Sequence, residues 1–117
     1  MRFDDARKLA LALPEVEESS SYGRPAFKVR GKLVACRRQD DHRVLVLRVD
    51  PAELELMLRA RPETFFVTPH YAGYPYVLVR LDEVGADELR ELLTDAWLMQ
   101  APKRLAAPFL AEAPSLQ

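Results

Sequence analysis

Nearly half of the basic side chains of this 117-residue sequence fall in one stretch, where closely spaced cations could bind phosphate groups. Residues 24–48 carry eight Lys and Arg residues against two Asp residues, which is a local charge of +6. The remaining residues carry nine basic and sixteen acidic side chains, so the formal charge of the whole chain is −1. We predict a DNA-binding surface on the basic stretch, and its candidate residues are Arg24, Lys28, Arg30, Lys32, Arg37, Arg38 and Arg43.

A second interpretation of the same charges is purely structural. Lys and Arg are common at the outward positions of half-buried strands, where they also protect sheet edges against aggregation. The acidic balance of the rest of the chain gives a pI of about 6.1, which argues against a dedicated high-affinity DNA-coating protein. Both interpretations stay open from the sequence alone.

The segment from Thr68 to Tyr76 is unusually rich in aromatic residues and in prolines. It could be a rigid loop that presents His70, Tyr71 and Tyr74 to a ligand, a base or a peptide. It could equally be a connection between two strands, in which the prolines and Gly73 fix the path of the chain.

Catalytic and metal-binding patterns are missing from the sequence. His42 and His70 are the only histidines, and they lack metal-ligand spacing with each other or with Cys36. Cys36 is the only cysteine, so an intrachain disulfide is impossible, and its place inside an expected strand is typical of a small buried residue. No G-x-S-x-G nucleophile motif occurs. We therefore expect no metal, no cofactor and no enzymatic activity.

The elements that would position these residues follow from hydrophobic spacing and from turn residues. Asp50-Pro51 is the clearest helix start, because Asp can cap the helix and Pro suits its first position. Gly31 permits a tight hairpin, and Trp97 shares the apolar face of the last helix. We expect helices over 3–13, 51–61 and 86–99, and strands over 26–30, 32–38, 43–49, 65–68 and 76–81.

This element order, α-β-β-β-α-β-β-α, predicts an α+β fold with two layers. Its strands come as hairpins, so the sheet should be mostly antiparallel with helices on one face. Residues 15–21, which hold three Glu and three Ser residues, are expected to form a loop. One domain should cover residues 1–105, followed by a loosely ordered tail over 106–117 with Pro108 and Pro114.

The sequence also predicts a soluble, cytoplasmic protein without a membrane partner. Asp4 and Asp5 stand where a signal peptide would be basic, and no uninterrupted apolar segment follows them. Apolar runs such as Val44 to Leu47 are far shorter than the roughly 20 residues of a membrane-spanning helix. The oligomeric state stays open.

Several separated motifs, in order, resemble the MmcQ/YjbR family of small bacterial proteins, over residues 1–105. They are Leu13-Pro14-Glu15-Val16-Glu17-Glu18, Tyr22-Gly23-Arg24-Pro25-Ala26-Phe27-Lys28-Val29, Phe65-Phe66-Val67-Thr68-Pro69-His70-Tyr71, Gly73-Tyr74-Pro75, Trp97 and Ala101-Pro102-Lys103-Arg104-Leu105. The resemblance implies a secretion-chaperone-like α-β(3)-α-β(2)-α architecture, which agrees with the order expected above. It also implies a DNA-binding role, and it assigns no catalytic residue.

Two other functions remain as alternatives to DNA binding. The first is a protein- or peptide-interaction module, suggested by the secretion-chaperone-like fold alone. An exposed apolar patch or a large symmetric dimer interface would favour it. The second is a small-molecule-binding protein that uses the His70/Tyr74 loop, which a pocket holding both side chains would favour.

Overall fold

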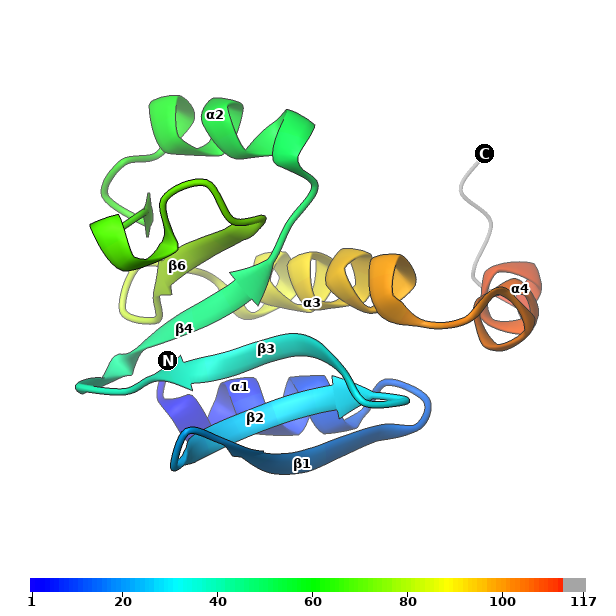
Figure 1. Cartoon of the computed structure of the whole chain (residues 1–117). Coiled ribbons are helices and arrows are strands. Elements are labelled where there is room, and N and C mark those ends of the chain that lie inside the picture. Colours follow the sequence, from blue (N-terminus) through cyan, green and yellow to red (C-terminus); the bar gives the residue numbers. More distant parts are fainter. Residues whose placement is uncertain (113–117) are drawn as a thin grey trace.

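The structure is a computed structural model that describes residues 1–112. Within these residues, the chain forms four α-helices, one short 3-10 helix and a sheet of six strands (Figure 1). Among the described residues, no helix combines the length and the apolar character needed to cross a membrane. The elements are α1 (Phe3–Leu11), β1 (Val16–Ser21), β2 (Arg24–Val29), β3 (Lys32–Arg38), β4 (Asp41–Arg48), α2 (Pro51–Ala60), β5 (Phe65–Phe66), η1 (Pro69–Tyr71), β6 (Tyr76–Arg80), α3 (Ala86–Gln100) and α4 (Lys103–Glu112).

The sheet is antiparallel throughout, with the strand order β1-β2-β3-β4-β6-β5. Arg30 and Gly31 join β2 to β3 with φ angles of 50° and 82°, the left-handed pair that a tight type I′ hairpin turn requires. Asp50 accepts a hydrogen bond of 2.9 Å from the backbone N–H of Ala52 and so caps α2. The predicted α+β class and the predicted antiparallel sheet are therefore confirmed.

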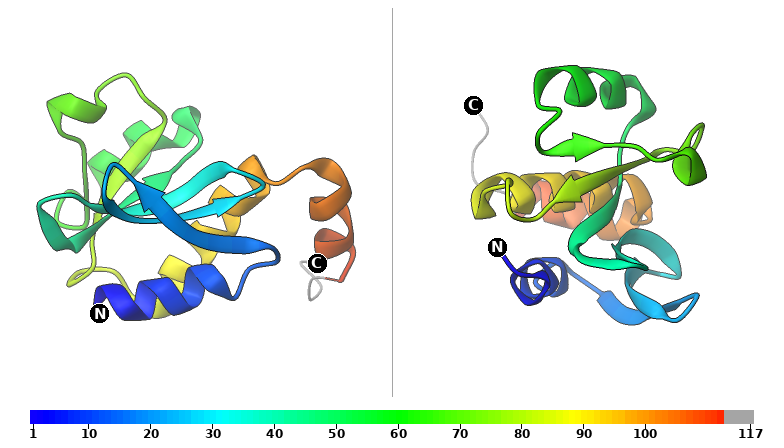
Figure 2. Two further views of the ribbon diagram at one scale, coloured as in Figure 1. Left: turned by 60° about the horizontal axis from the view of Figure 1, so that its bottom comes forward. Right: turned by 90° about the vertical axis from the view of Figure 1, so that its left-hand side faces the viewer.

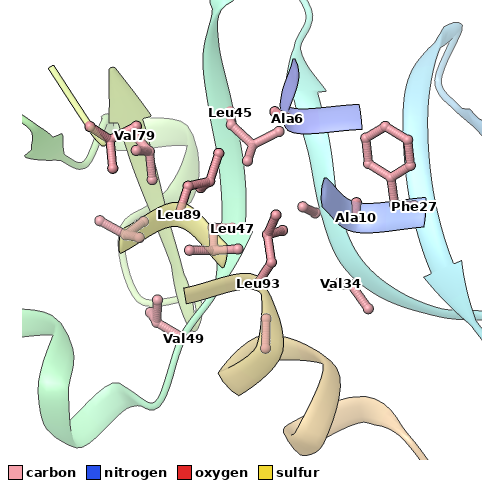
Figure 3. Close-up of a cluster of buried hydrophobic side chains, with 14 of the residues drawn as sticks. Ala6, Ala10, Phe27, Val34, Leu45, Leu47, Val49, Val79, Leu89 and Leu93 are labelled. Atoms are coloured by element: carbon pink, nitrogen blue, oxygen red, sulfur yellow. The ribbon is translucent and has the colours of Figure 1, made fainter. Parts of the chain in front are cut away.

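Helices α1 and α3 pack side by side against one face of the sheet (Figures 1 and 2). We call it the helix-covered face. The main core lies between the two layers and joins Phe27, Leu45 and Leu47 of the sheet to Leu89 and Leu93 of α3 (Figure 3). Helix α2 lies along the β5 edge and packs its partly buried apolar residues against the same core.

The opposite side of the sheet carries no long helix, and we call it the open face. A smaller buried cluster forms its floor: Ala26, Cys36, Val44, Val46 and Leu78. The segment around η1 crosses this side of the sheet, far from α1 and α3 (Figure 2, right). Tyr71 of η1, together with Phe66 and Tyr76, packs against the cluster. The open face is thus partly covered at one end and accessible elsewhere.

The expected loop over residues 15–21 is wrong, because most of it forms strand β1. The strand pairs with β2 in continuous register from Val16↔Val29 to Ser21↔Arg24. Residues 17–20 are exposed. An edge strand is held mainly by backbone hydrogen bonds to its neighbour, so its side chains need no apolar alternation. The alternation of apolar and polar residues, which would have predicted a strand, is therefore absent from this segment.

The expected disorder after Leu105 is also wrong for the residues that the structure describes, since helix α4 continues to Glu112. Leu105, Ala106 and Phe109 pack against the main core. The ring of Phe109 lies 4.8 Å from that of Trp97, centroid to centroid. These apolar residues recur at helical spacing, and their packing stabilises α4 although Pro108 lowers the helix propensity of the segment. The remainder of the expected tail, residues 113–117, lies outside the described residues.

Candidate functional site

Arg24 and Lys28 project from β2 onto the open face. Ala26 pairs with Cys36, and Lys28 pairs with Leu33, whose side chains both belong to the open-face cluster. Residues directly opposite each other in a sheet share a face, and so do residues two apart in one strand. Within the described residues, neither Arg24 nor Lys28 forms an ion pair.

Cys36 lies on the floor beneath these two cations. Burial raises the pKa of the Cys36 thiol, while the positive charges of Arg24 and Lys28 act in the opposite direction. The thiol is fully buried, so it is a packing residue in the folded protein, as the sequence predicted. Its surroundings show that both cations lie close enough to Cys36 for their fields to act on it.

Arg38 brings a third cation to the same face from the end of β3. Its guanidinium lies 5.8 Å from the centre of the Phe66 ring, which packs against the open-face cluster. The Arg38 Nε also forms an ion pair of 2.9 Å with Asp40 in the turn that follows. The Arg38 guanidinium therefore has two contacts within the chain, the Phe66 ring and the exposed carboxylate of Asp40.

A cavity of about 270 Å³ lies between the start of β2, the β3–β4 turn and η1. We call it the Arg24–Tyr71 pocket. Two of its lining residues have a buried polar atom without a hydrogen-bond partner among the described residues, Arg24 Nε and Tyr71 Oη, and Arg37 Nε is a third such atom outside the pocket. Buried polar groups are nearly always paired in folded proteins, so two unpaired donors beside one cavity indicate a functional site. Its lining residues are Arg24, Arg38, Gln39, Asp40, Thr68, His70 and Tyr71.

Consecutive turns hold Tyr71 in this position. Pro69 opens the 3-10 helix, where its fixed φ suits the first position. The N–H of Tyr71 donates to the carbonyl oxygen of Thr68 at 2.9 Å, and the N–H of Tyr74 donates to that of Tyr71 at 3.0 Å. His70 packs edge-on against the Tyr71 ring with 4.8 Å between centroids. The backbone thereby places the Tyr71 side chain against the sheet and leaves His70 exposed.

Arg30 and Lys32 lie at the tip of the β2–β3 hairpin, away from the pocket. The guanidinium of Arg30 binds both oxygens of Glu15, at 2.7 and 3.3 Å. This contact holds the pKa of Glu15 below its ordinary value. Lys32 pairs across the sheet with Val29, whose side chain belongs to the helix-covered core, so Lys32 projects to that side.

Arg37, Arg43 and Tyr74 also lie apart from the pocket. Arg37 pairs with the core residue Leu45 and therefore projects toward the helix-covered face. The side chain of Arg43 donates to the carboxylate of Asp41 at 3.2 Å. Tyr74 is well exposed and does not line the cavity. Of the ten residues proposed from the sequence, the structure brings four together in the pocket, with Lys28 on the same face.

One further arginine of the open face was not among the proposed site residues. Arg80 pairs with Val44, lies 4.1 Å above the Phe66 ring, and donates to the carbonyl oxygens of Pro62 and Glu63. Arg48, which was also not proposed, lies beside α2 and α3, where it contacts the amide oxygen of Gln100 at 3.4 Å and lines a cavity with Met57 and Leu92. The alternation of Tyr76, Leu78 and Arg80 along β6 could have placed Arg80 on this face. Its contacts with the chain assign it mainly to the scaffold.

A second, larger cavity of about 480 Å³ adjoins Arg80 but has mixed charge. Its walls carry three arginines and four carboxylates, so nothing in it selects an anion over a cation. In residues 1–112, no group of three or more His, Cys, Asp and Glu side chains could hold a metal ion. The Arg24–Tyr71 pocket is therefore the strongest candidate site.

Comparisons with known proteins show that the chain is similar to one family. The family model YjbR matches residues 11–99, a range that includes every residue of the pocket. Uncharacterized proteins of Mycobacterium tuberculosis and Mycobacterium bovis are 36% identical to the chain, over 93% of its length and 95% of theirs. The crystal structure of Deinococcus radiodurans protein DR2400, a DUF419 domain, matches with a TM-score of 0.72 and 29% identity, covering 84% of this chain and 77% of that one.

Proposed function

This chain belongs to the YjbR family, and on that premise we propose that it is a non-enzymatic domain that binds the phosphate backbone of DNA through its open face. The observation that carries the proposal is the pair Arg24 and Lys28. Both emerge on a face without a long helix, both lack an ion-pair partner in the described part of the chain, and Arg38 lies on the same face. Phosphate contacts from such cations supply most of the sequence-independent affinity of DNA-binding proteins.

The charges of the two layers are only partly separated. The first turns of α1 and α3 carry Asp4, Asp5, Asp87 and Glu88, and these helices cover the opposite face. The open face also carries carboxylates, since Glu17 lies opposite Lys28 in the sheet and Asp40 pairs with Arg38. The proposal therefore depends on the local cations Arg24, Lys28 and Arg38, and not on the net charge of −1.

The proposal also places the protein in the cytoplasm. The only cysteine, Cys36, is a free thiol, which suits a reducing compartment. Protein-binding and small-molecule functions find less support. The large apolar residues that are exposed, Tyr22, Leu56, Tyr74, Met99 and Leu110, come from separate elements, and His70 and Tyr74 do not share a pocket.

The test is fluorescence anisotropy of a labelled duplex of about 20 base pairs, titrated with protein at several NaCl concentrations. Three phosphate contacts should give a slope of log K against log salt of about −2.7, because each contact contributes about 0.9. The double variant Arg24→Gln/Lys28→Gln should bind at least about 10-fold more weakly, with a slope near −0.9.

The matched control is Arg59→Gln/Arg90→Gln, which removes the same charge from exposed positions on α2 and α3. It should retain most of the affinity and the full salt slope. Two results overturn the proposal. One is the absence of binding at about 50 mM salt, where phosphate contacts are strongest. The other is an equal loss of affinity in both double variants.

A further inference from the structure

We infer that the Arg24–Tyr71 pocket is a receptor for a terminal phosphate monoester. The inference rests on the proposed function, since it names the chemical group that the open face should hold most tightly. Such a group occurs at the 5′ end of a nucleic-acid strand and on a free nucleotide. The pocket should therefore distinguish the end of a strand from its interior.

The side chains that line the cavity favour an anion. Arg24 and Arg38 supply guanidinium groups, and Tyr71 supplies a hydroxyl. Arg24 Nε and Tyr71 Oη are buried and have no acceptor in residues 1–112. A guanidinium has no acceptor atom at all, so a ligand rich in acceptor oxygens suits this set. Phosphate matches the fork of an arginine with two parallel hydrogen bonds.

The position of Asp40 shows where such an oxygen can lie. Its carboxylate lines the same cavity and accepts from Arg38 Nε at 2.9 Å, while the Asp40 side chain is 74% exposed. An exposed ion pair of this kind contributes little to stability. A ligand oxygen can therefore replace the carboxylate on Arg38 at small cost, with Arg24 on the other side of the pocket left to bind a second oxygen.

Size and charge favour a terminal group over an internal one. Three separate segments line the cavity, which opens to solvent: the start of β2, the β3–β4 turn and η1. An internal phosphodiester carries a sugar on both sides, whereas a monoester enters with one substituent. The monoester also carries about −1.5 to −2 charges at pH 7, against −1 for a diester. The exposed ring of His70 at the rim offers a surface on which the attached sugar and base can stack.

The experiment compares two single-stranded 12-mers of identical sequence, both labelled at the 3′ end. One carries a 5′-phosphate and the other a 5′-hydroxyl, and anisotropy gives their Kd values at about 100 mM NaCl. We expect the phosphorylated strand to bind about 10-fold more tightly. Adenosine monophosphate, added as an unlabelled competitor, should displace it, whereas adenosine should not.

Variants locate the effect in the pocket. Arg24→Gln and Tyr71→Phe should each reduce the preference for the phosphorylated strand to about 2-fold or less. Tyr71→Phe keeps the aromatic ring and its packing, so it separates the hydroxyl from the fold. Arg59→Gln, on the distant helix α2, should keep the full preference. A circular dichroism melt confirms that each variant is folded.

The outcomes separate this inference from the proposed function. Equal binding of the two strands overturns the terminal-phosphate receptor and leaves backbone binding intact. Binding of adenosine monophosphate without binding of either strand supports the receptor and overturns DNA as its source of phosphate. Binding of none of these probes overturns both. A preference that survives in Arg24→Gln and in Tyr71→Phe overturns the assignment to this pocket.

Discussion

Arg38 and Asp40 form an ion pair of 2.9 Å at the rim of the pocket that also contains Arg24 and Tyr71. The pair joins the end of β3 to the turn before β4, so it is local and independent of the main core. The Arg38 guanidinium also lies 5.8 Å from the centre of the Phe66 ring. The carboxylate of Asp40 is thus the competitor that any anion must displace.

We predict that Asp40→Asn raises the affinity for the 5′-phosphorylated strand about 3- to 10-fold. The substitution removes a negative charge and frees Arg38, and anisotropy measures the change. Asp87→Asn is the control, because Asp87 is an exposed carboxylate that also pairs with an arginine, Arg90 on α3. An equal increase in both variants would assign the effect to net charge alone and contradict competition at Arg38.

Tyr71→Phe should leave the free energy of unfolding unchanged or raise it by up to about 1 kcal/mol. The Tyr71 hydroxyl is buried without a partner among the described residues, so its removal relieves an unpaid desolvation cost. Urea unfolding of the ligand-free protein measures the change. A loss of more than about 1 kcal/mol would show that the hydroxyl is paired in solution, against the geometry described here.

Trp97→Phe should lower the free energy of unfolding by about 2–3 kcal/mol. The indole Nε1 donates to the carbonyl oxygen of Pro14 at 2.9 Å, which ties α3 to the turn between α1 and β1. The side chain is fully buried, and its ring packs against Phe109 of α4. Leu110→Ala, at an exposed position of α4, should change stability by less than about 0.5 kcal/mol in the same urea experiment.

The fold was predictable where a local signal decided it. Asp50-Pro51 and Gly31 act through their own backbone geometry, and Trp97 lies on a periodic apolar face, so these features were found from the sequence, although Arg30 was expected in the strand and not in the turn. Strand β1 had no such signal, because its pairing with β2 depends on backbone hydrogen bonds to residues further along the chain. Helix α4 was missed for a related reason, since it depends on a contact between Phe109 and Trp97.

The candidate site was predictable only in part. The basic stretch gave Arg24, Lys28 and Arg38, and the aromatic segment gave His70 and Tyr71, but nothing in the sequence joined the two sets. Period-two alternation separates Arg37 from Arg38 by face. The pairing of Arg30 with Glu15 depends on the fold, because Glu15 precedes an unpredicted strand. Composition therefore overestimated the number of cations available to a ligand.

Asp41 should make the folded protein sensitive to acid. The backbone N–H and the guanidinium of Arg43 donate to its carboxylate and hold the pKa of Asp41 below its ordinary value. The folded-state pKa is thus lower than the unfolded one, near 3.9. The contribution to stability is therefore complete above that pH and disappears as the pH falls through the folded-state value.

We therefore expect Asp41→Asn to lower the urea midpoint at pH 7 and to flatten its decline between about pH 5 and pH 2. The control is Asp4→Asn, which alters an exposed carboxylate of α1. If the urea midpoints of the wild type and of Asp41→Asn declined equally steeply at low pH, the role of this contact would be contradicted. Glu15 and Arg30 would then be the next pair to vary.

Cys36 should report on the pocket from beneath. Burial raises the pKa of its thiol and blocks access, so iodoacetamide at pH 8 should alkylate the folded protein at least about 100-fold more slowly than the urea-unfolded chain. Tyr71 packs on the cluster that contains Cys36. Residual reaction in the native state that is faster than global unfolding therefore measures a local opening of the open face, to which the η1 segment contributes through Tyr71.

A ligand that binds Tyr71 and Arg24 together should hold that segment closed. The 5′-phosphorylated strand is then expected to slow alkylation of Cys36 further, while the 5′-hydroxyl strand at equal occupancy leaves the rate nearly unchanged. Mass spectrometry of the modified chain gives both rates. Faster alkylation with the phosphorylated strand would mean that binding opens η1, and Tyr71 would then be displaced by the phosphate instead of contacting it.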